Sequence, residues 1–268
     1  MMKHLVAILI LILLDIAYAK AAIDSGEARR VGNAIGDLYR EEIKSRLNLD
    51  LEVRHVVGGS GIFVDGVRII HFEQKALVTL SNVVGGHPAV TKDAYALLVC
   101  HEFGHILGGG PTVTTKLNGT LSVEGQADYW ATAICFKRYA SEIEATTERL
   151  IRKLKIPEKV FEQCREHLTK EEATSSDPTK ALLICQRAIA ASISFANYFN
   201  ATKVSMAAPI VDIDKIAPPV SKTLLKYGSN QCRINTFVAG AYCKESYDGK
   251  CDEEYNRRPA CWFVANDL

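Results

Sequence analysis

A five-residue segment in the first half of the chain carries the residue types of a catalytic metal site. It reads His101-Glu102-Phe103-Gly104-His105. On a helix, the two histidines are one turn apart and project from the same face, so both imidazoles can bind one metal ion. Glu102 then lies beside that face, where it can reach a metal-bound water without occupying a coordination position. The segment therefore indicates metal-assisted hydrolysis.

A third ligand must come from elsewhere, because a catalytic zinc site takes three protein ligands and leaves one position for water. Eighteen positions, residues 106–123, separate His105 from Glu124. Asp128 follows Glu124 by four residues, so both carboxylates share one face of a second helix. Glycines in the intervening segment allow this helix to return beside the first. We predict that Glu124 binds the metal and that Asp128 accepts the outer ring N–H of a ligating histidine, which fixes its tautomer.

This pattern resembles the gluzincin family of zinc metallopeptidases. The likeness covers about 40 residues, from position 93 to position 135, and consists of HExxH, the eighteen-residue gap and ExxxD. Glu124-Gly125-x-Ala127 is similar to the third-ligand helix of the aminopeptidase branch, and Glu124-x-x-x-Asp128 is also the pattern of thermolysin-like branches. The aminopeptidase branch carries an upstream GxMEN segment that captures the substrate's free amine, and this chain has none. The resemblance therefore favours an endopeptidase.

The resemblance implies a zincin-like fold and a zinc-dependent reaction. It assigns Zn²⁺ to His101, His105 and Glu124, and the reaction to the hydrolysis of peptide bonds. Zinc lowers the pKa of a bound water to about 7, and the resemblance makes Glu102 the general base and later the proton donor.

The negative charge that develops on the substrate oxygen needs a further hydrogen-bond donor. Tyr198, on a helix predicted well after Glu124, is one candidate, and Tyr129 and His87 are two others. The sequence does not choose among them, because the choice depends on geometry. Each of the three could instead be a packing or surface residue.

Two other functions fit the same residues. The first is a non-catalytic secreted zinc-containing binding protein, and the second is a zinc amidase acting on cell-wall amide bonds. The complete general base at Glu102 favours catalysis, and we expect a peptide or protein substrate. Basic and acidic residues number 32 and 31, for a formal net charge of +1, so we expect no nucleic-acid partner.

The segment that precedes the metal motif predicts one helix and a small sheet. Apolar residues recur at helical spacing over residues 25–47, and segments rich in β-branched residues follow at 51–57, 61–70 and 76–80. Asp65-Gly66 is typical of a tight hairpin turn. The strand at 76–80 occupies the place of the edge strand in the resembled family, where an extended peptide could add to it, although an interior strand is equally consistent.

The metal motif and the second half of the chain predict helices. Thr91 is a plausible N-cap for a helix that ends at the glycines from position 108, and Ser122 is expected to cap a second helix running to about residue 139. Further helical patterns cover about residues 145–154, 157–168 and 179–199. We therefore predict an α+β fold with a small N-terminal mixed sheet, a two-helix zinc site and a helical second half.

The N-terminus has the three-part form of an export signal. Lys3 precedes an apolar run at residues 5–14 and an Ala-x-Ala cleavage site at 17–19, so we predict a signal peptide at 1–19 and a secreted or periplasmic protein. The run is shorter than the roughly twenty residues of a spanning helix, and we expect no later segment to span a membrane. A metallopeptidase-like domain at 20–206, a proline-containing linker at 207–220 and a cysteine-rich lobe or tail at 221–268 are expected to follow.

The eight cysteines, an even number behind an export signal, favour disulfides. The last four lie close together in a short segment with little apolar content, which needs cross-links to hold a fold. Cys100 directly precedes His101, and Cys135 falls two turns beyond Asp128. A bridge between Cys100 and Cys135 would join the two ligand-bearing helices, and a pair of buried thiols is the alternative.

Overall fold

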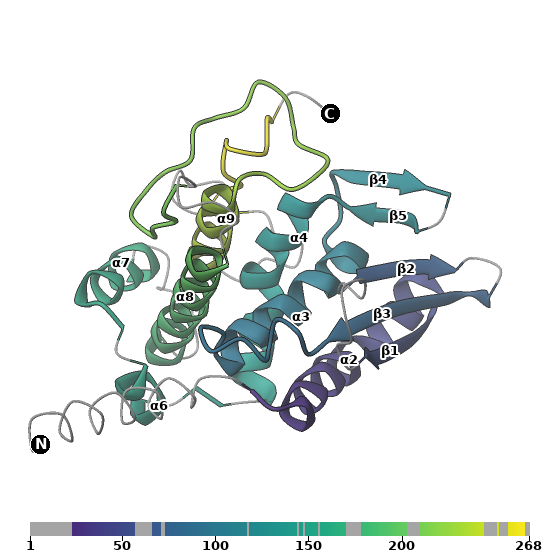
Figure 1. Ribbon diagram of the computed structural model, residues 1–268, viewed down its shortest axis with the longest axis horizontal. Coiled ribbons are helices and arrows are strands. Elements are labelled where there is room, and N and C mark those ends of the chain that lie inside the picture. The colour runs from purple at the N-terminus through teal and green to yellow at the C-terminus, as the bar shows by residue number, and fades with distance from the viewer. Residues whose placement is uncertain are drawn as a thin grey trace, which may run out of the picture.

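The computed structural model describes residues 23–56, 66–70, 73–116, 118–143, 145–146, 148–154, 156–169, 178–202, 209–243, 251 and 257–265. Within these ranges a small mixed sheet lies at one side of a group of helices, which confirms the α+β class (Figure 1). The predicted signal segment and Asp65 of the predicted hairpin lie outside the described residues.

The helix α2 (Ser25–Leu47) packs against β1 of the sheet and against α3. It begins at Asp24, whose side chain accepts a hydrogen bond from the backbone N–H of Glu27 at 2.7 Å. It ends at Asn48, which adopts the left-handed conformation with φ of 55°. Of the apolar residues at helical spacing, Val31, Ile35 and Ile43 are buried and Leu38 is partly buried, whereas Leu47 at the end of the helix is 41% exposed. The amphipathic pattern therefore identified the buried face except at its last position.

The sheet has the strand order β1-β3-β2, with β1 (Asp50–Val56) parallel and β2 (Gly66–Ile70) antiparallel to β3 (Lys75–Ser81). Among the described strands β3 is therefore interior, which is the second of the two alternatives that the sequence left open for residues 76–80. The reason lies in its burial, because Ala76 and Val78 are fully buried and Leu77 on the opposite face is also covered. The two edge strands of this sheet are β1 and β2, and β2 lines the cavity that also contains His105 and Glu124.

The helix α3 (Lys92–Leu107) crosses the middle of the molecule (Figure 1). As predicted, Thr91 caps it, accepting a hydrogen bond from the backbone N–H of Ala94 at 3.2 Å, and it ends just before Gly108. The first turn is anchored by Asp93, whose carboxylate receives two hydrogen bonds from the buried Arg187 guanidinium at 2.8 and 2.7 Å. The N-terminal end of α3 is therefore fixed by Thr91 and Asp93, and the helix stops at Gly108. The metal motif lies in its last two turns.

Two short strands, β4 (Thr112–Thr115) and β5 (Gly119–Ser122), form an antiparallel hairpin between the two ligand-bearing helices. The sequence analysis anticipated only a glycine turn there. The prediction that Ser122 caps the next helix is also wrong, because its hydroxyl donates to the carbonyl of Gly109 at 2.7 Å. Val123 occupies the N-cap position of α4 and makes no side-chain capping bond.

The remaining described elements are helical. Those up to residue 201 agree with the predicted helical patterns, whereas the helix at residues 230–242 lies in the segment expected to be a cysteine-rich lobe or tail and was not predicted. They are α4 (Glu124–Trp130), η2 (Ala131–Cys135), α5 (Phe136–Arg138), η3 (Tyr139–Ile143), α6 (Glu148–Lys153), α7 (Glu158–Thr169), α8 (Pro178–Ala201) and α9 (Asn230–Tyr242). The first four run on continuously, with η2 and η3 as π-helical turns. The helix α8 packs between α9, α3 and α7, and α9 also packs on α4 and η2. The helix α9 therefore lies against α4, which carries the predicted third ligand, Glu124.

One segment of α8, Thr179–Ala201, is long and apolar enough to cross a membrane by length and composition, contrary to the expectation that no such segment follows the N-terminus. Core helices of globular proteins have the same properties, and 61% of its most apolar window is buried inside the protein. It also carries the buried polar residues Gln186 and Arg187. Its packing against α3, α7 and α9 accounts for its apolar character.

All eight cysteines form disulfides, which confirms the prediction from their even number. The pairs are Cys100–Cys135, Cys164–Cys185, Cys232–Cys261 and Cys243–Cys251. The first joins α3 to η2, the continuation of α4, as the bridge hypothesis required. Four disulfides indicate an oxidising environment outside the cytosol.

The segments after α8 pack on the same body as the sheet and α3. The part of the expected linker that is described includes Val211, which is buried and exchanges two hydrogen bonds with the side chain of Asn200 at the end of α8. The helix α9 contributes Ile234 and Phe237 to the main hydrophobic core. A smaller cluster of buried residues, including Trp262, joins the C-terminal segment to α4 and α9.

Candidate metal centre

The two ligand-bearing helices approach closely because Gly104 faces the backbone of α4. A Cβ atom at position 104 would lie 2.7 Å from the carbonyl oxygen of Ala127 and 2.8 Å from its Cα, closer than real Cβ contacts. Only glycine permits this approach. The Cys100–Cys135 disulfide holds the same two elements together one residue before His101. The result is that Glu124, at the start of α4, faces the histidines of α3.

The donor atoms of His101, His105 and Glu124 form one cluster, in which all lie within 4.8 Å of one another. The oxygen Oε2 of Glu124 is 3.2 Å from Nε2 of His101 and 3.4 Å from Nε2 of His105. The two imidazole rings have centroids 4.7 Å apart and lie nearly perpendicular, at 81°. The structure therefore brings together the three residues that the sequence analysis selected as metal ligands.

Each imidazole is oriented by a partner on its other nitrogen. Nδ1 of His105 is 2.8 Å from the backbone carbonyl oxygen of Ser122. A carbonyl only accepts, so Nδ1 carries the proton and Nε2 presents its lone pair to the cluster. Nδ1 of His101 is 2.7 Å from Oδ1 of Asp128, so this carboxylate lies where the sequence analysis expected it. Both rings thus aim Nε2 at the same point.

The electrostatics of the cluster favour a positive charge between the ligands. Burial alone would lower the pKa of His101, but the carboxylates of Asp128, Glu124 and Glu102 outweigh it and raise the pKa to about 10. Burial would raise the pKa of Glu124, but the imidazoles of His101 and His105 lower it well below its ordinary value. The protein therefore stabilises cationic imidazole and anionic carboxylate at this point, the charge pattern that a bound metal cation also satisfies.

The residues present fit a metal ion. Nε2 of His101 and Oε2 of Glu124 are buried, and neither makes a well-aligned hydrogen bond with the described residues. Two buried lone pairs 3.2 Å apart repel each other unless a proton or a cation lies between them. Two imidazoles and one carboxylate form the donor set of catalytic zinc sites, and imidazole also suits other transition metals. The cluster can therefore hold a metal, and its donors do not by themselves identify which one.

Glu102 lies beside the ligands without being one of the clustered donors. Its side chain is almost fully buried and yet lines the same cavity as His105 and Glu124. Burial raises its pKa, the imidazoles of His101 and His105 lower it, and the net direction is upward. A carboxyl group with a raised pKa at the wall of a polar cavity is suited to exchanging protons with a molecule inside it.

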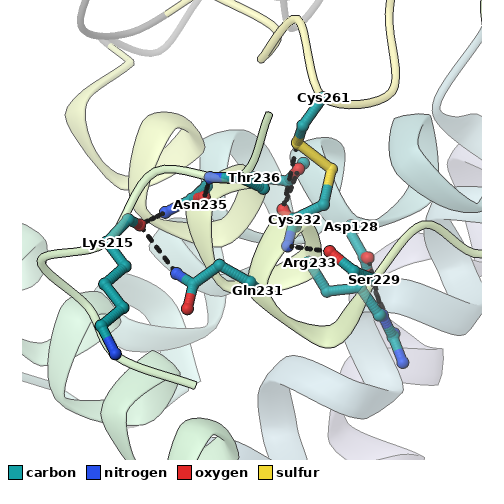
Figure 2. The surroundings of a disulfide bond; sticks show 10 residues. Asp128, Lys215, Ser229, Gln231, Cys232, Arg233, Asn235, Thr236 and Cys261 are labelled. Carbon is teal, nitrogen blue, oxygen red and sulfur yellow. Dashed lines mark hydrogen bonds and ion pairs between the residues drawn. A yellow bond between two sulfur atoms is a disulfide. The ribbon is translucent and has the colours of Figure 1, made fainter. Parts of the chain in front are cut away.

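Arg233 of α9 completes the support of the cluster, and the sequence analysis did not identify it. Its guanidinium donates two hydrogen bonds to Asp128, from Nε to Oδ2 at 2.9 Å and from Nη2 to Oδ1 at 2.8 Å (Figure 2). Burial alone would raise the pKa of Asp128, but the charge of Arg233 keeps it below its ordinary value. Asp128 therefore stays anionic beside His101. Nothing in the local sequence pattern relates positions 128 and 233, which are 105 residues apart.

Tyr227 is the second residue that the sequence analysis missed. Its ring stacks on His101, with centroids 6.1 Å apart and an angle of 19°, and the Arg233 guanidinium lies 4.5 Å from its centroid. Desolvation raises its pKa, Arg233 opposes this, and Glu124 is among the carboxylates that add to the rise. Tyr227 is 54% exposed and lines the cavity with Glu102. No local pattern marks Tyr227, because its segment has neither helical nor strand periodicity.

The three candidates for the oxyanion donor lie elsewhere. Tyr129 is fully buried in the cluster that packs the C-terminal segment. Tyr198 and His87 contact each other, with ring centroids 5.1 Å apart, and the side chain of His87 accepts a hydrogen bond from the backbone N–H of Ala89. None of the three lines the cavity at the metal site. The structure does not bring them together with the ligands.

The cavity at the metal site has a volume of about 590 Å³ and connects the cluster to β2, one of the two edge strands of the sheet. It extends from Glu102, His105 and Glu124 past the β4–β5 hairpin to β2, and residues 225 and 227 form another wall. Its lining combines charged groups, such as Arg68, with apolar ones, such as Leu121. The site is therefore accessible to a molecule considerably larger than water.

Comparisons of the chain with models of protein families, with curated proteins and with solved structures find no match.

Proposed function

We propose that this protein is a zinc-dependent peptidase of the gluzincin type, and that endopeptidase activity is its main one. The observation that carries the proposal is the convergence of His101, His105 and Glu124 on one point, with Glu102 beside them at a cavity wall. A purely structural zinc site is normally closed by four protein ligands. Here the described residues supply three, and the cluster opens on a cavity.

The metal ligands, Glu102 and the Asp128–Arg233 pair have separate roles in the proposed reaction. His101, His105 and Glu124 would hold Zn²⁺, which when bound would supply Lewis acidity and lower the pKa of a water to about 7. Glu102 takes a proton from the attacking water and returns it to the leaving amine, which needs a carboxyl group at the cavity wall. Asp128 and Arg233 hold His101 in the orientation that leaves Nε2 free for the metal.

The edge strand β2 favours an extended peptide as the substrate. The backbone N–H of Ile69 donates to the carbonyl of Asn118 at 3.0 Å, so it points away from β3. Because backbone groups alternate along a strand, the N–H and C=O of Val67 point to the same side. Val67 also lines the cavity. A peptide could therefore pair with β2 at Val67 and pass the metal site, the role that the sequence analysis considered for residues 76–80.

The proposal is tested by metal analysis of the purified protein together with a peptide-library digestion. We expect about one zinc per chain and internal cleavage of peptides, which a chelator abolishes and zinc restores. Peptidoglycan fragments digested in parallel distinguish an amidase from a peptidase. One zinc per chain with hydrolysis of neither substrate would favour the non-catalytic binding role, and a chain without zinc would refute the proposal.

Tyr227 is proposed as the donor that stabilises the negative charge on the substrate oxygen, because its side chain lines the cavity together with Glu102 and Glu124. We expect Tyr227→Phe to lower kcat by about 10²- to 10³-fold, the usual cost of removing one oxyanion donor. The ring and its stacking on His101 remain, so zinc content and KM should change little.

Tyr198→Phe is the matched control, since Tyr198 lies outside the cavity, and it should leave kcat unchanged. Steady-state kinetics on one fluorogenic peptide compares the two variants. Equal kcat values for Tyr227→Phe and the unaltered protein would contradict the assignment.

A further inference from the structure

The C-terminal segment, residues 257–265, packs directly on the helix that carries the third ligand. Trp262 is 1% exposed and lies against Gly125. A Cβ atom at position 125 would meet the indole of Trp262 at 2.2 Å, so the ring lies directly on the α4 backbone. Gly125 is the residue after Glu124. The position of the Trp262 ring therefore constrains the start of α4 and with it the Glu124 carboxylate.

Arg258 in the same segment bridges the ends of the two ligand-bearing helices. Its Nη1 donates to the carbonyl oxygen of Gly110 at 3.1 Å and to Oε1 of Gln126 at 3.2 Å. The amide of Gln126 in turn donates to the carbonyl oxygen of Gly108 at 2.7 Å. The segment therefore contacts the turn that follows α3 and the first turn of α4 at once.

The segment is anchored to α9 by the Cys232–Cys261 disulfide (Figure 2). Each cysteine neighbours a residue that supports the metal centre. Cys261 precedes Trp262, and Cys232 precedes Arg233, which holds Asp128 with two hydrogen bonds. The Cys232–Cys261 bond thus links the segment of Trp262, which packs beside Glu124, to Arg233, which holds Asp128 beside His101.

We propose that the Cys232–Cys261 disulfide controls the metal affinity of the site, so that the dithiol form binds zinc weakly and oxidation completes the centre. The reaction is thiol–disulfide exchange with a disulfide-containing oxidant, such as oxidised glutathione. The two thiols lose two protons and two electrons and form one S–S bond, while the oxidant is reduced to two thiols. The chain would then acquire its metal only after it reaches an oxidising compartment. This inference rests on the metal-binding part of the proposed function and not on hydrolysis.

The other C-terminal disulfide provides a matched comparison. Cys243–Cys251 closes a loop of sequence separation 8 at the C-terminal end of α9. Cys243 lies eleven residues beyond Cys232, roughly three turns along α9. Its described neighbour Tyr242 contacts Gln163 and His167 rather than a metal ligand. Its removal changes the number of cross-links equally and leaves the Trp262 and Arg233 contacts anchored.

The test compares the full-length double variants Cys232→Ser/Cys261→Ser and Cys243→Ser/Cys251→Ser. The apparent zinc Kd is measured by competition with a chromophoric chelator, and the free energy of unfolding of the metal-free proteins by urea titration. We expect the first variant to bind zinc about 10- to 100-fold more weakly, the range found when groups that orient ligands are lost. The second variant should bind as the unaltered protein does. Equal zinc affinity of the two variants would overturn the proposal.

Trp262→Ala, with all disulfides intact, tests the same link without removing a cysteine. It should weaken zinc binding and speed hydrogen exchange of the α4 amides in the metal-free protein, while the α2 amides stay protected. Trp262→Phe should restore part of both properties. If Trp262→Ala binds zinc normally and leaves α4 protected, the segment does not position the site, even where the cysteine variant fails to fold. Hydrogen exchange needs neither metal nor substrate. It therefore tests whether Trp262 positions α4 separately from whether the protein is a zinc peptidase.

Discussion

Glu102→Gln is expected to keep zinc and to lose hydrolysis, with kcat lowered by about 10²- to 10⁴-fold. Glutamine has nearly the same shape and cannot take a proton from water at neutral pH. Glu102 is outside the cluster of donor atoms, so the amide leaves His101, His105 and Glu124 in place. The measurements are the zinc content of the purified variant and its kcat on a fluorogenic peptide.

The control for this variant is Glu41→Gln, an exposed glutamate on α2 that does not line the cavity. It should match the unaltered protein in both measurements. A Glu102→Gln variant with full zinc and undiminished kcat would contradict the assignment of the general base. A variant that retained a non-enzymatic biological activity while losing hydrolysis would instead favour the binding role.

Arg233→Met is expected to lower the free energy of unfolding by about 3–5 kcal/mol, the usual cost of removing one partner of a buried ion pair. Asp128 has only 2% of its side chain exposed, and Arg233 is the cation that donates two hydrogen bonds to it. Without Arg233 the buried Asp128 carboxylate loses the larger of the two charges that lower its pKa and keeps only His101, so its pKa should rise. Urea unfolding of the metal-free protein at neutral pH measures the loss.

A double-mutant cycle with Asp128→Asn isolates the interaction from the general cost of each substitution. The double variant has no buried anion left without a partner, so it should be more stable than the sum of the single changes predicts. Arg233→Lys keeps a charge but cannot form the bidentate pair of hydrogen bonds. Its free energy of unfolding should therefore lie between those of the unaltered protein and of Arg233→Met. Additive effects of Arg233→Met and Asp128→Asn would show that the pair is not coupled.

The local parts of the site could be predicted from the sequence because they depend on neighbours along the chain. One helical turn places His101 and His105 on a common face whatever surrounds them. The Thr91 cap and the stop at Gly108 are also local, and both are present in the structure. The even number of cysteines indicated disulfides. The Cys100–Cys135 bridge is present, and it is one of the two alternatives that the sequence left open for these cysteines.

The errors and the alternatives left open concern segments whose structure depends on distant partners. For the strand at residues 76–80 the sequence left edge and interior positions open. It is interior because β1 and β2 both pair with it, and no local pattern shows which strand has two neighbours. Ser122 has the residue type of an N-cap, but its hydroxyl bonds to Gly109 across the hairpin instead. The short strands β4 and β5 carry little periodicity of their own and exist because they pair with each other.

The sequence alone determined the chemical identity of the centre, meaning two imidazoles one turn apart, a carboxylate beside them and another carboxylate at a distance that a returning helix can cover. Only the tertiary structure decided which groups surround that centre. Arg233 and Tyr227 reach it from a segment more than a hundred residues later, and their spacing along the chain carries no periodic signal. The physical reason is that helical geometry is set by bonds between near neighbours, whereas contacts between helices are set by packing of the whole chain.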